Sequence, residues 1–316
     1  MTPIVAVSID VECDKDERWA VRRPLAFRGV EEGIGERLAP LFAEYHVRPT
    51  YLLSPEVIHH SGCAGLLRNL EDCELGAHLH PEFVDPGEQP PETAAVPCQM
   101  PEERERQDLR KLTEDFVAAF GRPPVSYRAG RYGASARSLR ALTELGYLVD
   151  SSVTPGKLWD YGLDFRGAPA QPYYPDADDI VKCRPSGPLL EIPISLRPSP
   201  MPPRLGSAVQ VIARTHLQAA KDVAKWARGP AWFRPGWSKR RALLAFVRAA
   251  SGGEWGGILN MMFHNVDMVP GCSANASSPE RVQTALDDLR AVFEEVVTRG
   301  GCFLTLAEIR EHVLRR

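Results

Sequence analysis

The stretch IVAVSIDVE, residues 4–12, decides the fold of this chain. Residues 4–9 form a short β-rich run, and acids follow where the run ends. A continuous apolar run is typical of a strand in a parallel sheet that is buried on both faces. In a (β/α) barrel, the carboxyl end of such a strand is where the chemistry is carried.

Similar short runs recur along the chain, at 49–53, 74–78, 125–127, 189–194, 258–263 and 301–304. Amphipathic helical patterns lie between them, at 33–45, 102–120, 135–145, 280–298 and 306–314. This alternation predicts a mostly parallel sheet or barrel that is covered by helices. We expect one α/β domain over residues 1–316, with long loops at 85–101 and 155–207 that shape a site.

The composition excludes several classes of protein. A net charge of -3 and a charged content of 25% do not fit a nucleic-acid-binding or disordered protein. The seven cysteines are scattered and never form a CxxC pair, which argues against a disulfide framework or a structural zinc knuckle. Residues 1–13 lack a basic region, and their apolar stretch is too short for a signal peptide. We therefore expect a cytoplasmic protein.

Two acids and two histidines follow predicted strands. Asp10 and Glu12 are two residues apart, so strand alternation puts both side chains on one face. His78 and His80 have the same spacing and can bind a single transition metal beside a carboxylate. An acid at a strand end can equally cap a helix, and paired histidines occur by chance. The two pairs together predict a metal site.

An arginine and a further histidine also lie at predicted strand ends. Arg128 stands in the segment YRAGRYG, residues 127–133, whose glycines let the backbone approach closely. A guanidinium beside a carboxylate lowers its pKa and keeps it ready to take a proton. His264 is the first strongly polar residue after the run at 258–263 and suits proton donation near neutral pH. A solvated turn and a core histidine are the alternatives.

These residues, in this order, resemble the motifs of the polysaccharide deacetylase family, the fourth carbohydrate esterase family, over essentially the whole chain. The matching segments are SIDVEC at 8–13, HLHPE at 78–82, YRAGRYG at 127–133 and FHN at 263–265. The resemblance implies a distorted, incomplete (β/α) barrel. It also implies a metal-dependent hydrolase that removes an N-acetyl group from an amino sugar in glycan or glycolipid biosynthesis.

The resemblance assigns a role to each residue of the site. Asp10 is expected to be the catalytic base, Arg128 to tune it, and His264 to be the acid. One divalent ion, most plausibly zinc, is expected on three ligands, Glu12, His78 and His80. Asp150, Tyr132 and Trp159 are expected to bind the substrate, Asp150 because Asp150-Ser151-Ser152 looks like the fourth motif of the family.

Two departures from the commonest family pattern affect the metal ligands. Val11 separates Asp10 from the next acid, so Glu12 becomes the expected metal carboxylate. One residue separates the histidines where three are usual, and Glu82 occupies the position four after His78. The third ligand is therefore His80 or Glu82. We favour His80 because imidazole suits zinc and Pro81 begins a new turn.

A basic segment with several tryptophans lies at about 211–250. It holds nine Lys or Arg residues and one acid, a balance of +8. Such a segment can lie on an anionic membrane surface, and arginines also recognise phosphate. A pair of helices with a solvated basic face is the alternative. The segment raises the expectation of a lipid-linked or nucleotide-linked sugar substrate and of peripheral contact with the inner face of a membrane.

Two other functions remain open on this sequence. The same machinery acts on a carbonyl group, so it can also hydrolyse a non-sugar amide such as a cyclic amide or a formamide. A catalytically silent sugar-binding protein is the third reading, which the altered ligand spacing would favour if it failed to hold metal.

Overall fold

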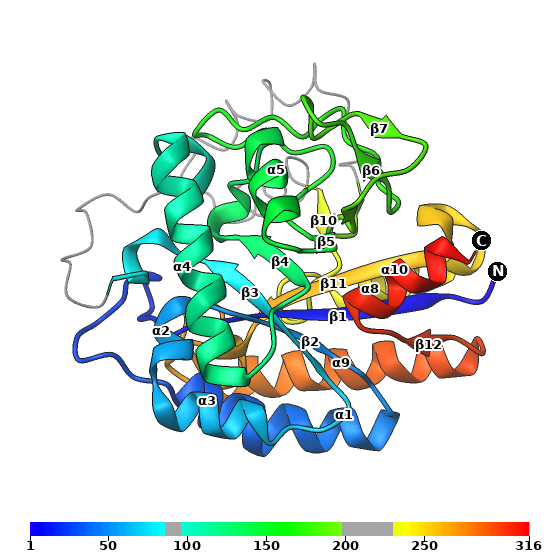
Figure 1. The fold of residues 1–316 in the computed structure, drawn as a ribbon. Helices are drawn as coiled ribbons and strands as arrows, with labels where there is room; N and C mark the ends of the chain where they lie inside the picture. The colour runs from blue at the N-terminus through cyan, green and yellow to red at the C-terminus, as the bar shows by residue number, and fades with distance from the viewer. Residues whose placement is uncertain (86–95, 198–229, 316) are drawn as a thin grey trace, which may run out of the picture.

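A computed structural model describes residues 1–85, 96–197 and 230–315 and contains one large parallel sheet. Its strands are β1 (Ile4–Val11), β2 (Thr50–Leu53), β3 (Glu74–Leu79), β4 (Ser126–Ala129), β5 (Val149–Asp150), β8 (Leu190–Glu191), β11 (Ile258–His264) and β12 (Cys302–Phe303). Their order is β11-β1-β2-β3-β4-β5-β8, and β12 pairs with the beginning of β1 (Figure 1). The run at 4–12 therefore forms an inner strand of the sheet, with β11 on one side and β2 on the other.

The sheet is curled and stops short of a closed barrel. In the described parts of the chain, its end strands β8 and β11 are not paired with each other. The segment after β8 crosses the gap between them, where the backbone N–H of Ser195 donates to the carbonyl of Asn260 at 3.1 Å. This is the distorted, incomplete (β/α) barrel that the sequence predicted. All eight residues of β1 are buried, which is why its sequence lacks the alternation of a half-exposed strand.

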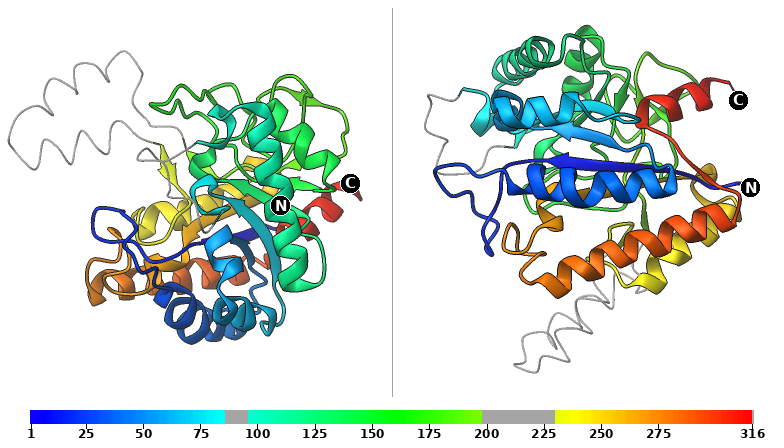
Figure 2. Two further views of the ribbon diagram at one scale, coloured as in Figure 1. Left: turned by 60° about the vertical axis from the view of Figure 1, so that its left-hand side comes forward. Right: turned by 90° about the horizontal axis from the view of Figure 1, so that it is seen from below.

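Helices cover the outer side of the sheet (Figures 1 and 2). They are α1 (Ala39–Tyr45), α2 (Pro55–His59), α3 (Ser61–Arg68), α4 (Glu102–Phe120), α5 (Ala136–Glu144), α8 (Arg240–Ser251), α9 (Pro279–Thr298) and α10 (Leu306–Leu314). The helix α9 begins at its predicted signal, because Ser278 caps it by accepting from the N–H of Arg281 and Pro279 is its first residue. The bounds of α4 and α10 are those predicted.

The helix predicted at 33–45 differs from the structure at its beginning. A π-helical segment, η1 (Gly29–Leu38), precedes α1 and packs against η6 (Asn265–Met268). A Cβ atom at Gly29 would lie 2.7 Å from the side chain of Asn265, and one at Gly33 would lie 2.9 Å from its carbonyl oxygen. The early start thus depends on a contact with residues far away in the sequence.

Short strands lie within the predicted loop 155–207. They are β6 (Tyr174–Pro175), β7 (Cys183–Arg184), β8 and β9 (Leu196–Arg197), and β9 pairs with β10 (Ala231–Trp232). Much of the predicted loop at 85–101 and the first half of the basic segment lie outside the described residues. No helix in the described ranges is long and apolar enough to cross a membrane.

Candidate metal centre and the residues around it

Strand register brings distant polar residues to one edge of the sheet. On neighbouring parallel strands, Asp10 of β1 is paired with His264 of β11, and His78 of β3 with Arg128 of β4. All four side chains are buried near the carboxyl ends of their strands. The predicted residues therefore meet where parallel α/β folds carry their chemistry.

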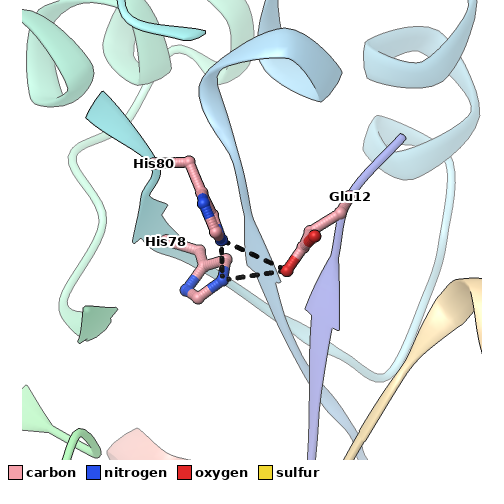
Figure 3. Close-up of side chains that lie close together, drawn as sticks. All are labelled: Glu12, His78 and His80. Carbon is pink, nitrogen blue, oxygen red and sulfur yellow. Dashed lines mark hydrogen bonds and ion pairs between the residues drawn. The ribbon is translucent and has the colours of Figure 1, made fainter. Parts of the chain in front are cut away.

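Glu12, His78 and His80 form a compact, buried cluster (Figure 3). Oε1 of Glu12 lies 3.3 Å from Nε2 of His78 and 3.2 Å from Nε2 of His80. The two Nε2 atoms are 3.1 Å apart. One ligand atom from each residue therefore faces a common point.

This cluster fits a divalent metal in both spacing and chemistry. Four-coordinate zinc holds nitrogen and oxygen ligands at about 2.0–2.1 Å, so neighbouring ligands lie about 3.3 Å apart. The three atoms already have nearly this spacing, and two imidazoles with one carboxylate are a common zinc ligand set. The residues present can therefore hold a metal ion.

Neighbouring groups orient both imidazole rings. The carbonyl oxygen of Arg128 lies 2.9 Å from Nδ1 of His78, so a proton on Nδ1 leaves the Nε2 lone pair free for a metal. Nδ1 of His80 lies 3.3 Å from Oε1 of Glu82, which also pairs with the guanidinium of Arg131 at 2.5 Å. Glu82 thus contacts the Nδ1 side of His80, whereas Nε2 faces Glu12, and Glu82 is not part of the three-residue cluster.

Glycines allow the close approach that the segment 127–133 predicted. A Cβ atom at Gly130 would lie 3.2 Å from the ring of His80 and would collide with the carbonyl oxygen of Leu79. One at Gly133 would lie 2.5 Å from the side chain of Val96. Any larger residue at these positions would displace the backbone beside the metal cluster.

A fully buried guanidinium holds Asp10. Arg128 donates from Nη1 to Oδ1 of Asp10 at 2.6 Å, from Nη2 to the hydroxyl groups of Ser8 and Ser151 at 2.6 and 2.8 Å, and from Nε to the carbonyl oxygen of Ser151 at 2.8 Å. Burial alone would raise the pKa of Asp10, but Arg128 and the nearby histidines reverse this and leave its pKa lowered. Asp10 is therefore a charged carboxylate at neutral pH.

Asn260 organises this network, although the sequence did not single it out. Its Oδ1 accepts from Ser8 at 2.7 Å, and its Nδ2 donates to Ser151 at 2.8 Å. Asn260 thereby holds in place both hydroxyl groups that accept hydrogen bonds from Arg128. A polar side chain in the apolar run at 258–263 was the available signal, because buried amides need hydrogen-bond partners.

Lys15 is a second buried residue that the sequence did not indicate. Its ammonium lies 3.0 Å from Oε2 of Glu12, and both side chains are only 4% exposed. Burial alone would raise the pKa of Glu12, but Lys15 together with His80 lowers it well below its usual range. Glu12 therefore directs one oxygen to the histidines and the other to a cation. No local pattern in the sequence distinguishes Lys15 from a surface lysine.

His264 faces the carboxylates from the opposite side. Its Nε2 atom lies 3.8 Å from Oδ2 of Asp10 and 3.5 Å from Oε1 of Glu12. The edge of Trp19 packs on the ring, with the two centroids 5.0 Å apart. Burial, followed by the charge of Arg234, lowers the pKa of His264. The predicted acid is thus within reach of the predicted base.

Two of the three predicted substrate-binding residues belong to an aromatic cluster. Tyr132 stacks on Trp159 at 5.2 Å between centroids, and Trp159 stacks on Tyr161 at 5.7 Å. Trp232 lies across Tyr132 and Trp159. The hydroxyl of Tyr132 contacts Met262, two residues before His264, so the cluster adjoins the site.

Asp150, the third of these residues, lies beneath the site and has no exposed surface. It accepts a hydrogen bond from Ser152 at 2.6 Å and is paired across the strands with Glu191, which is also fully buried. Burial and their mutual repulsion raise the pKa of Glu191 well above its usual range, and burial raises that of Asp150. Both pKa shifts favour the protonated form of these two carboxyl groups.

Two hollows lie near the sheet. A cleft of about 310 Å³ is lined by Glu82 and Phe83, which follow His80 in the sequence, and by Glu56 and His60, but by no residue of the metal cluster. A larger hollow of about 590 Å³ lies beside α1 near Arg48, and no residue of the cluster lines it.

No family model matches the sequence, and no curated protein matches it. Solved structures do match over nearly the whole chain. A Mycobacterium smegmatis protein described as a "putative polysaccharide deacetylase" has a TM-score of 0.57 and 17% identity, and the match covers 100% of this chain and 92% of the other.

Two further structures extend the comparison. A Parabacteroides distasonis protein described as a "putative glycoside hydrolase/deacetylase" has a TM-score of 0.61 at 15% identity, covering 98% of this chain and 71% of the other. The Puue allantoinase has a TM-score of 0.52 at 13% identity, covering 98% and 89%. Likeness at this level of identity concerns the architecture, and the chain therefore has the fold of the polysaccharide deacetylases.

Proposed function

We propose that this protein is a metal-dependent hydrolase that removes an N-acetyl group from an amino sugar. One observation carries the proposal: a metal-binding cluster of Glu12, His78 and His80 lies beside Asp10, which Arg128 holds as a charged carboxylate. The deacetylase fold of the chain supports the same reaction class.

The residues of the chain divide the work around the amide. A bound divalent ion, zinc by its ligand set, would polarise the amide carbonyl and stabilise the negative charge that develops on its oxygen. Asp10 takes a proton from the attacking water, because Arg128 keeps the carboxylate charged. Arg128 keeps its own proton, since guanidinium is not deprotonated in proteins.

His264 supplies a proton to the leaving nitrogen as the C–N bond breaks. The proton held by Asp10 then returns to His264, whose Nε2 atom lies 3.8 Å away. One water molecule is consumed, its hydroxyl going to the acyl carbon and its hydrogen to the amine.

The aromatic cluster suits a sugar ring. Trp159, Tyr161 and Trp232 are half-buried, and the exposed parts of this cluster offer apolar surface on which the C–H groups of a pyranose can pack. Tyr132 connects this surface to Met262 of β11, the strand that ends at His264. We assign the N-acetyl group to the metal side and the sugar ring to the aromatic side.

A lipid-linked or nucleotide-linked sugar at the inner face of a membrane is part of this proposal. In the described part of the basic segment, Lys239, Arg240 and Arg241 are exposed, and Trp237 is 51% exposed. Basic groups beside an exposed tryptophan favour an anionic surface. Co-sedimentation with phosphatidylserine vesicles tests this, and absence of binding at low salt would contradict it.

A cyclic amide is the second candidate substrate. The likeness to an allantoinase favours it, because that enzyme shares the architecture. A pocket for a small cyclic amide needs no aromatic surface for a sugar, so the two candidates differ in whether Trp159→Ala raises KM.

Metal analysis and product release test the proposal. The purified protein should hold about one zinc per chain, and it should release acetate from a panel of N-acetylhexosamine conjugates. If the protein holds zinc and opens cyclic amides but releases no acetate, its substrate is the second candidate, a cyclic amide. A protein that binds N-acetylated sugars without zinc or turnover would be a silent homologue.

A further inference from the structure

Arg234 approaches the site from a segment that the sequence marked only as basic. The backbone N–H of Phe233 donates to the carbonyl of Ser195 at 3.0 Å, and the carbonyl of Phe233 accepts from the N–H of Met262 in β11 at 3.2 Å. The ring of Phe233 is fully buried. These contacts anchor the chain beside β11 and place Arg234 near His264 at the end of that strand.

The guanidinium of Arg234 lies between a histidine and a carboxylate. Its Nη2 atom is 2.8 Å from Oδ2 of Asp267 and 3.1 Å from Nδ1 of His264. Nδ1 of His264 and Oδ2 of Asp267 are themselves 3.9 Å apart, too far for a hydrogen bond. The side chain of Arg234 is only 11% exposed, and its charged group packs over the ring of Trp237 at 5.2 Å.

Asp267 is held firmly enough to keep Arg234 in this position. Its Oδ1 atom accepts from the hydroxyl of Ser273 at 2.8 Å and from the amide of Asn275 at 3.1 Å. Its remaining oxygen is directed to Arg234. The position of the guanidinium is therefore set by a buried ion pair.

A guanidinium can only donate hydrogen bonds, so the imidazole nitrogen that faces it must accept. A proton on Nδ1 of His264 would point at the N–H group of Arg234. With Nδ1 accepting, the proton of the neutral ring is on Nε2, which faces Asp10 and Glu12. The other tautomer would leave Nε2 without a proton for a leaving group.

We propose that Arg234 is a positioning residue that fixes His264 as the tautomer protonated on Nε2. The tautomer itself does not depend on the proposed function. Only the use of the Nε2 proton, which is donation to the leaving nitrogen, rests on that function. Without Arg234, the carboxylate of Asp267, 3.9 Å from Nδ1, favours a proton on that nitrogen. Nε2 of His264, which faces the site, then carries no proton.

Nitrogen NMR of ¹⁵N-histidine-labelled protein tests the tautomer directly, without turnover. His264→Gln identifies the resonances of His264 in metal-free and zinc-loaded protein. We expect an unprotonated Nδ1 and a protonated Nε2 in the parent protein, and a shift toward protonated Nδ1 in Arg234→Met. A parent protein with protonated Nδ1, or an unchanged tautomer in Arg234→Met, would overturn the proposal.

A matched variant separates positioning from folding. Arg137 of α5 also pairs with a buried carboxylate, that of Glu105, at 3.0 Å, and it lies outside the site. We expect Arg234→Met to lower kcat by about 10- to 100-fold with KM and zinc content unchanged, and Arg137→Met to leave kcat unchanged. Equal losses in both variants would overturn the positioning role. If the parent releases no acetate, the proposed function fails, and the NMR result still decides the tautomer.

Discussion

Two groups of buried carboxylates lie under the same edge of the sheet and are balanced in different ways. Around the histidine pair, each carboxylate has a cation: Asp10 has Arg128, and Glu12 has Lys15. Asp150 lies on β5, next to the strand of Arg128, and Glu191 lies on β8, the strand after it. Neither makes an ion pair with any described residue, and each is the other's neighbouring carboxyl group. Both groups are almost completely buried.

This difference separates reactive carboxyl groups from supporting ones. A carboxylate beside a fixed cation stays charged after burial, so it can bind a metal or accept a proton. Two buried carboxyl groups without a cation retain a proton and act as a hydrogen-bonded pair. The same change, from acid to amide, should therefore affect turnover in the first group and the pH dependence of stability in the second.

The largest expected effect is that of Asp10→Asn. Removing the base should lower kcat by roughly 10²–10⁴-fold, while zinc content stays at the parent level, because Asp10 is not part of the ligand cluster. Acetate release and metal analysis on the same sample check this. Undiminished hydrolysis would remove Asp10 from the mechanism.

Arg128→Met should be the most damaging change to the fold of the site. It leaves the buried carboxylate of Asp10 without its cation, and breaking a buried pair costs about 3–5 kcal/mol of unfolding free energy. Urea denaturation measures this loss. Arg128→Lys is the control, since it keeps the charge and loses the hydrogen bonds to Ser8 and Ser151. A loss below 1 kcal/mol in Arg128→Met would show that the pair is not balanced by this cation.

Lys15→Met should strengthen metal binding. Lys15 repels an incoming cation and pairs with the second oxygen of Glu12, so removal of its charge should tighten zinc binding on the order of tenfold. Competition with a chromophoric chelator measures the dissociation constant. Lys157→Met, at the aromatic cluster, is a matched control that should leave zinc affinity unchanged. Weaker zinc binding in Lys15→Met would mean that Lys15 mainly orients Glu12.

The smallest effect is expected for Glu191→Gln. Folding raises the pKa of both Glu191 and Asp150, so their contribution to stability is complete below the ordinary carboxyl pKa and is lost as pH rises through the folded values. Unfolding free energy of the parent should fall as pH rises above the ordinary carboxyl pKa, by about 1.4 kcal/mol for each unit by which folding raises the pKa. Glu191→Gln should flatten this slope, and Asp150→Asn should do the same. Parallel pH curves in parent and variants would contradict the raised pKa values.

Local sequence patterns correctly predicted the helix ends that are determined by residues at those ends. The bounds of α4 and α10 were predicted, and α9 begins with the residues that signalled it. The beginning of η1 was not predicted, because it depends on contact with η6 at the other end of the chain. The short helices α2 and α3 span too few residues to show a clear period.

Residue spacing likewise predicted the site residues that lie within one short motif of the sequence. Spacing together with the family resemblance gave Glu12 and His78 as ligands and favoured His80 over Glu82 as the third, and the structure brings Glu12, His78 and His80 together. Spacing did not predict that Lys15 and Arg234 belong to the site, because their ion-pair partners are brought next to them only by folding. Arg234 was counted as one of nine basic residues, yet its side chain is almost completely buried.

The balanced charges of the cluster bear on how the protein is assembled. Because Arg128 and Lys15 already neutralise Asp10 and Glu12, folding does not leave uncompensated negative charge that only a metal could cancel. Small zinc domains, by contrast, unfold without their ion. In this chain the polypeptide can reach its native state first and acquire the ion afterwards. Removing the ion with a chelator should then yield a folded protein that regains activity when zinc is supplied.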